Sequence, residues 1–187
     1  MSSITNHRGQ PTDYVDSSVI QGLKTEADFI PIMKSLNGIE LIKSSNPYCS
    51  YDFNINGIPN IYIEYKSMNP YKYNLREYEY YFIPETKIID YKNIYNDYHN
   101  KALNGRICKS PIFFYIIRLK QKQTKIDEDG MKHILVKYKY IYAELNPYKI
   151  IAECQRKDKI EGILDNTTHY LIPKQWFKGL KYFIDNI

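Results

Sequence analysis

Hydrophobic residues recur every three or four positions in several stretches of the chain, a spacing that predicts amphipathic helices. The first stretch spans residues 25–36 and contains Pro31, which would bend a helix or move its start forward. The second follows Pro84 and ends near residue 105, at an Asn-Gly pair. Residues 176–184 have the same spacing and predict a C-terminal helix.

Shorter runs of β-branched and aromatic residues predict strands. Residues 111–119 are apolar almost throughout, as expected for a central strand that is covered on both faces. Residues 127–130 have turn chemistry and are expected to join this strand to the next one in a hairpin. The expected strands are 39–43, 49–55 and 60–68, which form a meander, and 111–119, 134–145, 149–154 and 169–173. Helices and strands in this order predict the α/β class, a sandwich with a central mixed β-sheet flanked by helices.

The chain has 187 residues, of which 43% are hydrophobic. A chain of this length can form one core that removes roughly 70% of the unfolded surface from water. Residues 1–20 are polar and lack apolar periodicity, so we expect a flexible N-terminal tail followed by a single domain, residues 21–187. No stretch approaches the roughly 20 apolar residues that cross a bilayer, and no secretion signal is recognised. We therefore expect a soluble intracellular protein with no membrane partner.

Composition excludes several classes of site. The formal net charge of +5 permits an acidic partner such as nucleic acid without requiring one. The three cysteines are far apart, which argues against a disulfide framework or a zinc knuckle. The four histidines are scattered, and the eight glycines form no GxGxxG or Walker-type loop, which argues against kinases and dehydrogenases.

Charged residues gather on one face of the predicted meander. Glu64 and Lys66 project from the same side of their strand because side chains alternate along it. On the strand before, Asp52 has the matching polar position. A tight turn at Asn56 and Gly57 would send Glu64 to the opposite face, so we exclude it; a three-residue loop or an equivalent bulge puts Asp52 across from Glu64. Two opposed carboxylates destabilise a strand pair unless a positive charge lies between them, which Lys66 and a hard divalent cation would supply.

This segment resembles the restriction-endonuclease-like nuclease superfamily, whose motif is written PD-(D/E)xK. The motif reads Tyr51-Asp52, eleven intervening residues, then Glu64-Tyr65-Lys66. Tyr51 stands where the family usually has proline. The family order of helix, three-stranded meander, helix and next strand covers residues 26–119. The resemblance implies a restriction-endonuclease-like sandwich.

The resemblance also implies roles for individual residues. Asp52 and Glu64 would bind Mg²⁺, for which Mn²⁺ can substitute, and the Tyr65 carbonyl is a candidate third ligand. Lys66 would orient the attacking water or help to deprotonate it. Many members place a further glutamate on the helix before the first strand, and Glu26 is the candidate here. The implied activity is metal-dependent hydrolysis of DNA phosphodiester bonds.

Restriction-type cleavage is the function we expect, by a homodimer if both strands are cut. Lys72 and Arg76 follow the motif closely and are candidate DNA-binding residues. The alternatives are a junction-resolving or repair nuclease of the same fold and a non-catalytic nucleic-acid-binding protein. A further alternative is that the charged residues of the motif form a solvated face with a surface salt bridge, worth about 0 to 1 kcal/mol.

Overall fold

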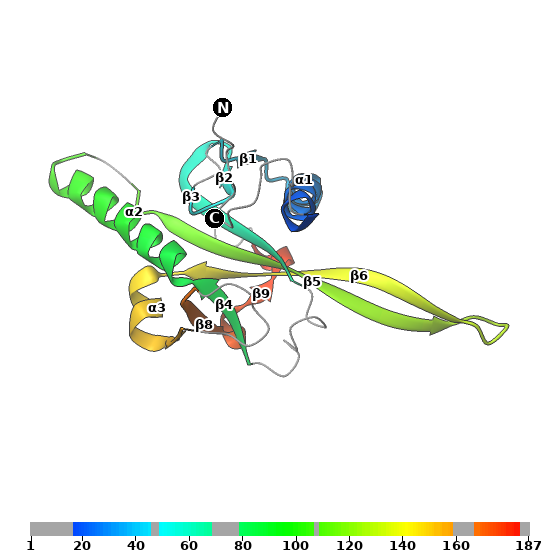
Figure 1. Ribbon diagram of the computed structural model, residues 1–187. Coiled ribbons are helices and arrows are strands. Elements are labelled where there is room, and N and C mark those ends of the chain that lie inside the picture. Colours follow the sequence, from blue (N-terminus) through cyan, green and yellow to red (C-terminus); the bar gives the residue numbers. More distant parts are fainter. Residues whose placement is uncertain (1–16, 46–48, 69–78, 107–108, 159–166, 184–187) are drawn as a thin grey trace, which may run out of the picture.

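The computed structural model describes residues 17–45, 49–68, 79–106, 109–158 and 167–183. Within these residues, a six-stranded mixed sheet and a three-stranded antiparallel sheet are accompanied by three α-helices (Figure 1). The large sheet has the order β1 (Leu41–Lys43), β2 (Phe53–Ile55), β3 (Ile58–Met68), β5 (Ile112–Ile126), β6 (Lys132–Leu145) and β9 (Lys178–Gly179). The small sheet has the order β4 (Tyr80–Pro84), β8 (His169–Pro173) and β7 (Gln155–Lys157). The helices are α1 (Ser17–Asn37), α2 (Glu85–Leu103) and α3 (Pro147–Glu153). The predicted α/β class with a central mixed sheet is confirmed.

Strands β3 and β5 form the parallel centre of the large sheet, and the other pairings in it are antiparallel. Residues 113–118 of β5 are buried, which confirms the expected central strand. A parallel pair needs a crossover connection, and the described part of this one contains β4 and α2. The predicted meander is confirmed as β1-β2-β3, and the predicted hairpin as β5-β6.

One face of the large sheet is covered by α1. Phe29 and Met33 of this helix are fully buried, and the Phe29 ring stacks on Tyr65 of β3 with 4.3 Å between ring centroids. Pro31 lies inside the helix and is exposed. The helix begins at Ser17, inside the segment expected to be a tail; residues 1–16 lie outside the described ranges. None of the described helices is long and apolar enough to cross a bilayer.

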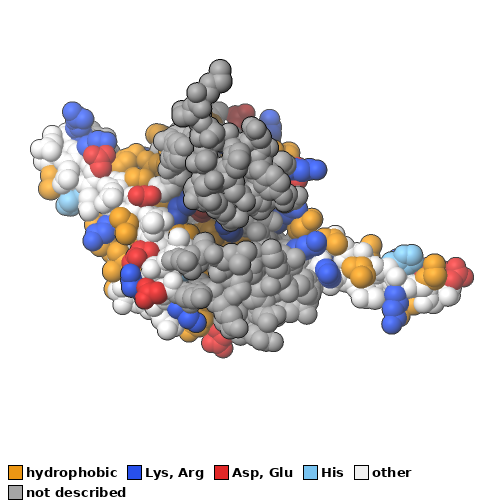
Figure 2. All heavy atoms as spheres, viewed as in Figure 1, with side chains coloured by type: hydrophobic (Ala, Val, Ile, Leu, Met, Phe, Trp, Pro, Cys, Tyr) orange, Lys and Arg blue, Asp and Glu red, His pale blue; other side chains and the backbone are white. Residues whose placement is uncertain are grey.

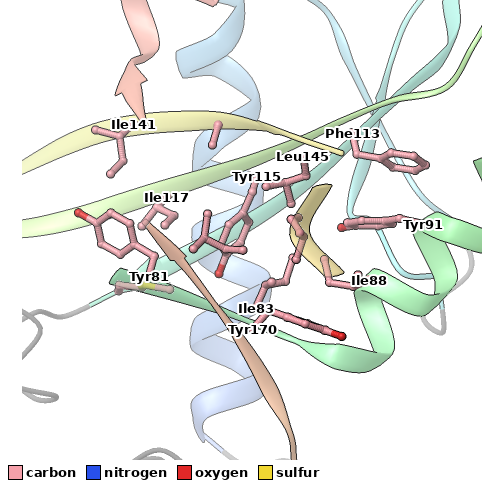
Figure 3. Close-up of a cluster of buried hydrophobic side chains, with 14 residues drawn as sticks. Tyr81, Ile83, Ile88, Tyr91, Phe113, Tyr115, Ile117, Ile141, Leu145 and Tyr170 are labelled. Atoms are coloured by element: carbon pink, nitrogen blue, oxygen red, sulfur yellow. The ribbon is translucent and has the colours of Figure 1, made fainter. Parts of the chain in front are cut away.

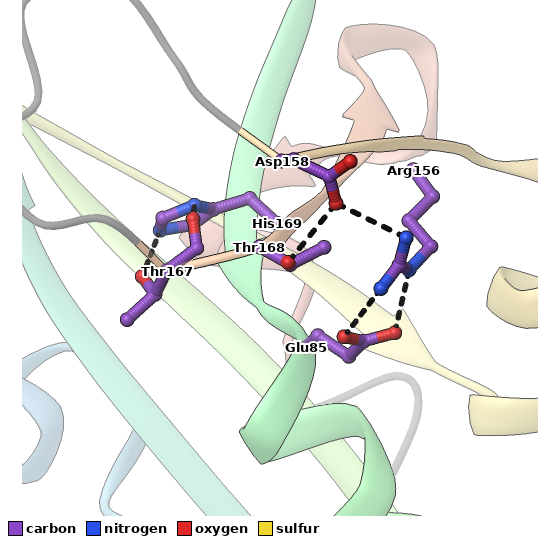
Figure 4. Close-up of polar contacts among 6 residues, drawn as sticks. All are labelled: Glu85, Arg156, Asp158, Thr167, Thr168 and His169. Atoms are coloured by element: carbon purple, nitrogen blue, oxygen red, sulfur yellow. Dashed lines mark hydrogen bonds and ion pairs between the residues drawn. The ribbon is translucent and has the colours of Figure 1, made fainter.

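The opposite face packs against α2 and the small sheet (Figure 3). Tyr91 of α2 is 1% exposed and stacks on Phe113 of β5, with 4.4 Å between ring centroids. The first residue of α2, Glu85, accepts two hydrogen bonds from the Arg156 guanidinium of β7, at 2.8 and 3.1 Å (Figure 4). Arg156 also pairs with Asp158. These contacts join the N-terminal turn of α2 to the small sheet.

The β2-β3 connection corrects the predicted turn. Ile55 pairs with Ile58 across a tight turn at Asn56 and Gly57, where Gly57 has φ +79°. The sequence analysis excludes this turn, because regular pairing from it would place Glu64 on the opposite face of the sheet from Asp52. That exclusion is wrong, since the strand register shifts between residues 54 and 55 and this shift returns Glu64 to the same face as Asp52. The bulge alternative is therefore the correct one, and it restores the predicted faces.

Two predictions near the C-terminus were also wrong. The expected edge strand 149–154 is largely α3, because Pro147 occupies the first turn and the Asn146 side chain accepts hydrogen bonds from the amides of Tyr148 and Lys149. The expected C-terminal helix is instead two 3₁₀ turns, Lys174–Trp176 and Leu180–Tyr182, separated by β9. Gly179 pairs with Ile141 there, so the segment between the turns is extended.

Candidate active site

Asp52 is held against β3 by two hydrogen bonds. Its amide donates to the Ile63 carbonyl at 2.9 Å, and its Oδ2 accepts from the Tyr65 amide at 2.8 Å. Phe53 pairs with Ile63, so the antiparallel register continued by one residue puts Asp52 across from Glu64. The carboxylate of Asp52 is thus fixed at the edge of β3 by the main chain.

Glu64 lies on the α2 side of the sheet and is 9% exposed. Its Oε2 accepts a hydrogen bond of 2.7 Å from the Lys87 ammonium, which α2 supplies from its first turn. Beside it on the next strand is Tyr115, whose hydroxyl donates to the Phe82 carbonyl at 3.1 Å. Glu64 is therefore a buried carboxylate with an ion-pair partner from another element.

The protein environment disfavours the ionised forms of both carboxylates. Burial, and next the charge of Asp52, raise the pKa of Glu64 to about 7, although Lys87 and Lys66 act in the opposite direction. Burial also raises the pKa of Asp52, against the opposing effects of the Tyr65 amide and of Lys87. Each of these pKa shifts means that the ionised carboxylate is less stable in the folded protein than in water, chiefly because burial removes it from solvent.

Lys66 and Glu26 lie within electrostatic range of this pair. Lys66 is exposed on the same face of β3 as Glu64, and its charge lowers the pKa of both Glu64 and Asp52. Glu26 of α1 raises the pKa of Asp52, but its own carboxylate forms an ion pair of 2.8 Å with Lys43. The structure therefore brings Asp52, Glu64 and Lys66 together, and it places Glu26 nearby with a cation of its own.

The chemistry of this pair fits a divalent cation with oxygen ligands. Asp52 and Glu64 supply carboxylate oxygens, the ligand type that hard divalent cations take. The amide and carbonyl of a strand residue point the same way, so the Tyr65 carbonyl faces the edge where Asp52 lies. Among the described residues, no three His, Cys, Asp or Glu side chains could hold one metal ion. Mg²⁺ is commonly held by one or two carboxylates, with water completing its shell.

Lys87 is the residue of this cluster that the sequence analysis did not select. Lys87 is too far from Glu64 in the sequence to belong to a local motif. Its helical position could have indicated it, because Lys87 lies four residues before the buried Tyr91 and therefore on the same side of α2, the side that faces the sheet. The predicted DNA-binding residues Lys72 and Arg76 lie outside the described residues.

Comparisons of the chain with protein-family models, with curated proteins and with solved structures gave no match.

Proposed function

We propose that this protein is a Mg²⁺-dependent DNA endonuclease with a restriction-endonuclease-like sandwich, of the restriction type. The observation that carries the proposal is the position of Asp52, directly before β2, across from Glu64 of β3, with raised pKa values for both carboxylates and with Lys66 on the same face of β3 as Glu64. A solvated surface salt bridge does not account for this arrangement, because Glu64 is 9% exposed. A buried carboxylate kept close to a second carboxylate is typical of sites that bind cations or transfer protons.

Asp52 and Glu64 would hold the cation, with the Tyr65 carbonyl as a further ligand. Bound Mg²⁺ would supply charge neutralisation at the phosphate and would lower the pKa of a coordinated water. Lys66 is the exposed ammonium of the cluster, so it is the group that can approach the attacking water or the scissile phosphate. Lys87 holds the Oε2 atom of Glu64 and thereby orients the carboxylate.

Plasmid nicking in the presence of Mg²⁺ tests the proposal. Wild type is expected to convert supercoiled DNA to nicked or linear forms, and Asp52→Asn, Glu64→Gln and Lys66→Ala are expected to lose this activity while staying folded. Glu144→Gln is the matched control, because Glu144 is exposed on β6 and pairs with Phe114, on the opposite face of the sheet. Equal nicking by all variants would overturn the proposal, and so would retardation of DNA by wild type without any cleavage.

A further inference from the structure

The outer half of the β5-β6 hairpin is an arm that projects from the rest of the molecule (Figure 1). We define the arm as residues 120–126 of β5 and 132–139 of β6 with the turn between them. Strand β3 pairs with β5 as far as Leu119, and β9 pairs with β6 at Ile141 and Tyr142, so neither reaches the arm. Two-stranded ribbons are marginally stable alone in water. A ribbon of this length that projects into solvent is therefore a candidate surface for a partner.

The charge of the arm is divided between its strands and its tip. Its two strand segments contain six lysines and no aspartate or glutamate. The acidic residues Asp127, Glu128 and Asp129 are confined to the turn. Basic and hydrophobic side chains are visible along the arm, and acidic ones at its end (Figure 2). Positive strands of this kind are complementary to a polyanion.

One face of the arm continues the face that carries the carboxylate pair. Lys66 pairs with Ile117, and Ile117 pairs with Ile141, so all three lie on one side of the sheet. Strand alternation then puts Lys139 and Lys137 on that same side of the arm. We call this side the carboxylate face; it also carries Gln121, Gln123, Lys125, His133 and Leu135.

The opposite face of the arm has a different character. Lys120 pairs with Tyr138, and Lys122 with Val136. Farther out, this face carries Thr124, Ile126, Lys132 and Ile134. Val136 and Ile134 are 44% and 66% exposed. Lysines are thus present on both faces, but only the carboxylate face combines them with amide side chains.

We propose that the carboxylate face of the arm binds duplex DNA, and this inference rests on the proposed endonuclease function. A two-stranded β-ribbon fits the major groove of B-DNA, which is about 12 Å wide. Lysines can neutralise phosphates, and Gln121 and Gln123 have the amide groups that pair with adenine edges. From Ile117, beside Lys66, to the end of β5 the strand extends roughly 30 Å, or about nine base pairs of duplex. The arm therefore contacts DNA on one side of the cleavage point, up to about one helical turn away.

The two faces supply a matched pair of variants for the test. Lys137→Ala/Lys139→Ala removes two charges from the carboxylate face, and Lys120→Ala/Lys122→Ala removes two from the other face of the same stretch. Binding is measured by fluorescence anisotropy with a labelled duplex of two helical turns, in the presence of EDTA so that no cleavage occurs. The first variant is expected to raise Kd about tenfold and to lower the slope of log K against log salt by about 2. The second is expected to change Kd less than about twofold.

Three results would overturn the inference. Equal weakening of DNA binding by both variants would mean that the positive charge of the arm contributes equally from either of its faces. Unchanged binding by the first variant would mean that the arm does not contact the duplex. A change in sedimentation behaviour with unchanged binding would assign the arm to a second copy of the chain.

Failure of this inference can be distinguished from failure of the endonuclease proposal. If wild type binds duplex through the carboxylate face but never nicks plasmid, DNA binding by the arm is supported and the endonuclease proposal is refuted. Wild type that nicks plasmid, while Lys137→Ala/Lys139→Ala binds normally, would refute the arm alone.

Discussion

Replacing Glu64 by glutamine is expected to abolish nicking and, at the same time, to stabilise the fold. Glutamine has nearly the shape of a protonated glutamate and can still accept the hydrogen bond from Lys87. In wild type above neutral pH, folding brings an ionised Glu64 into a buried position beside Asp52. The variant folds without that charge, so it avoids the associated free-energy cost.

The magnitude follows from the pKa of Glu64 in the two states. The pKa rises from 4.5 to about 7 on folding, so the native state holds its proton over a pH range in which the unfolded chain has lost it. For an acid with a raised native pKa, this linkage destabilises the fold progressively as pH rises from 4.5 to 7, and the penalty is complete above that range. The full penalty is about 3 kcal/mol, and at pH 5 it is less than about 1 kcal/mol.

Urea denaturation of wild type and Glu64→Gln at pH 5 and at pH 8 measures this difference. We expect the variant to unfold with a free energy about 2 to 3 kcal/mol above that of wild type at pH 8, and within about 1 kcal/mol of it at pH 5. Glu144→Gln serves as the control, since Glu144 is exposed and its replacement removes no buried charge. A Glu64→Gln protein that is less stable than wild type at pH 8 would show that Lys87 more than neutralises the ionised carboxylate, contrary to the argument.

Three further changes test other parts of the structure. Lys87→Met removes the cation from Glu64, so we expect a loss of about 1 to 3 kcal/mol in urea denaturation at pH 8 that diminishes at pH 5; a loss that is equal at both pH values would contradict the ion-pair argument. A Cβ added at Gly57 would meet no atom within 4 Å, but the backbone there has φ +79°. Gly57→Ala is therefore expected to lower the unfolding free energy by about 1 kcal/mol through backbone strain, and Gly57→Asn is expected to lower it less. Phe29→Ala empties a fully buried position stacked on Tyr65 and is expected to lower the unfolding free energy by about 3 to 5 kcal/mol; a loss below about 1 kcal/mol would mean that α1 does not depend on this contact.

Alternation along β3 made much of the candidate site predictable from sequence. Because side chains alternate along a strand, Ile63 and Glu64 must lie on opposite faces of the sheet. Phe53 of β2 is buried like Ile63, so the two share a face, and Asp52 then shares the other face with Glu64. The alternation of side chains could not decide which kind of connection joins β2 to β3. A loop of three residues and a tight turn followed by a bulge give the same faces, and the positive φ at Gly57 favours the second.

Capping and tertiary contacts explain where sequence reasoning failed. Residues 149–154 are apolar enough for an edge strand, but Asn146 and Pro147 provide a helix start that the strand pattern ignores. The C-terminal residues have helical spacing, yet Leu180 and Phe183 are buried at a short 3₁₀ turn after β9, where the Phe183 ring packs on Phe114 and Tyr142 of the large sheet. In the C-terminal segment Leu180 and Phe183 were recognised as hydrophobic positions and are buried, so the difference there lies in the local backbone.

The two lysines of the candidate site, Lys87 and Lys66, differ in their burial and in their partners. Lys87 is half-buried and bonded to Glu64, so any motion of its ammonium would leave a buried carboxylate unpaired, which restricts Lys87 to orienting that group. Lys66 is exposed, and its charge acts on both carboxylates from a position that solvent and a phosphate can reach. This arrangement keeps the acidic pair in place at the expense of stability and leaves the Lys66 side chain exposed, where the proposed endonuclease function would use it to approach a phosphate.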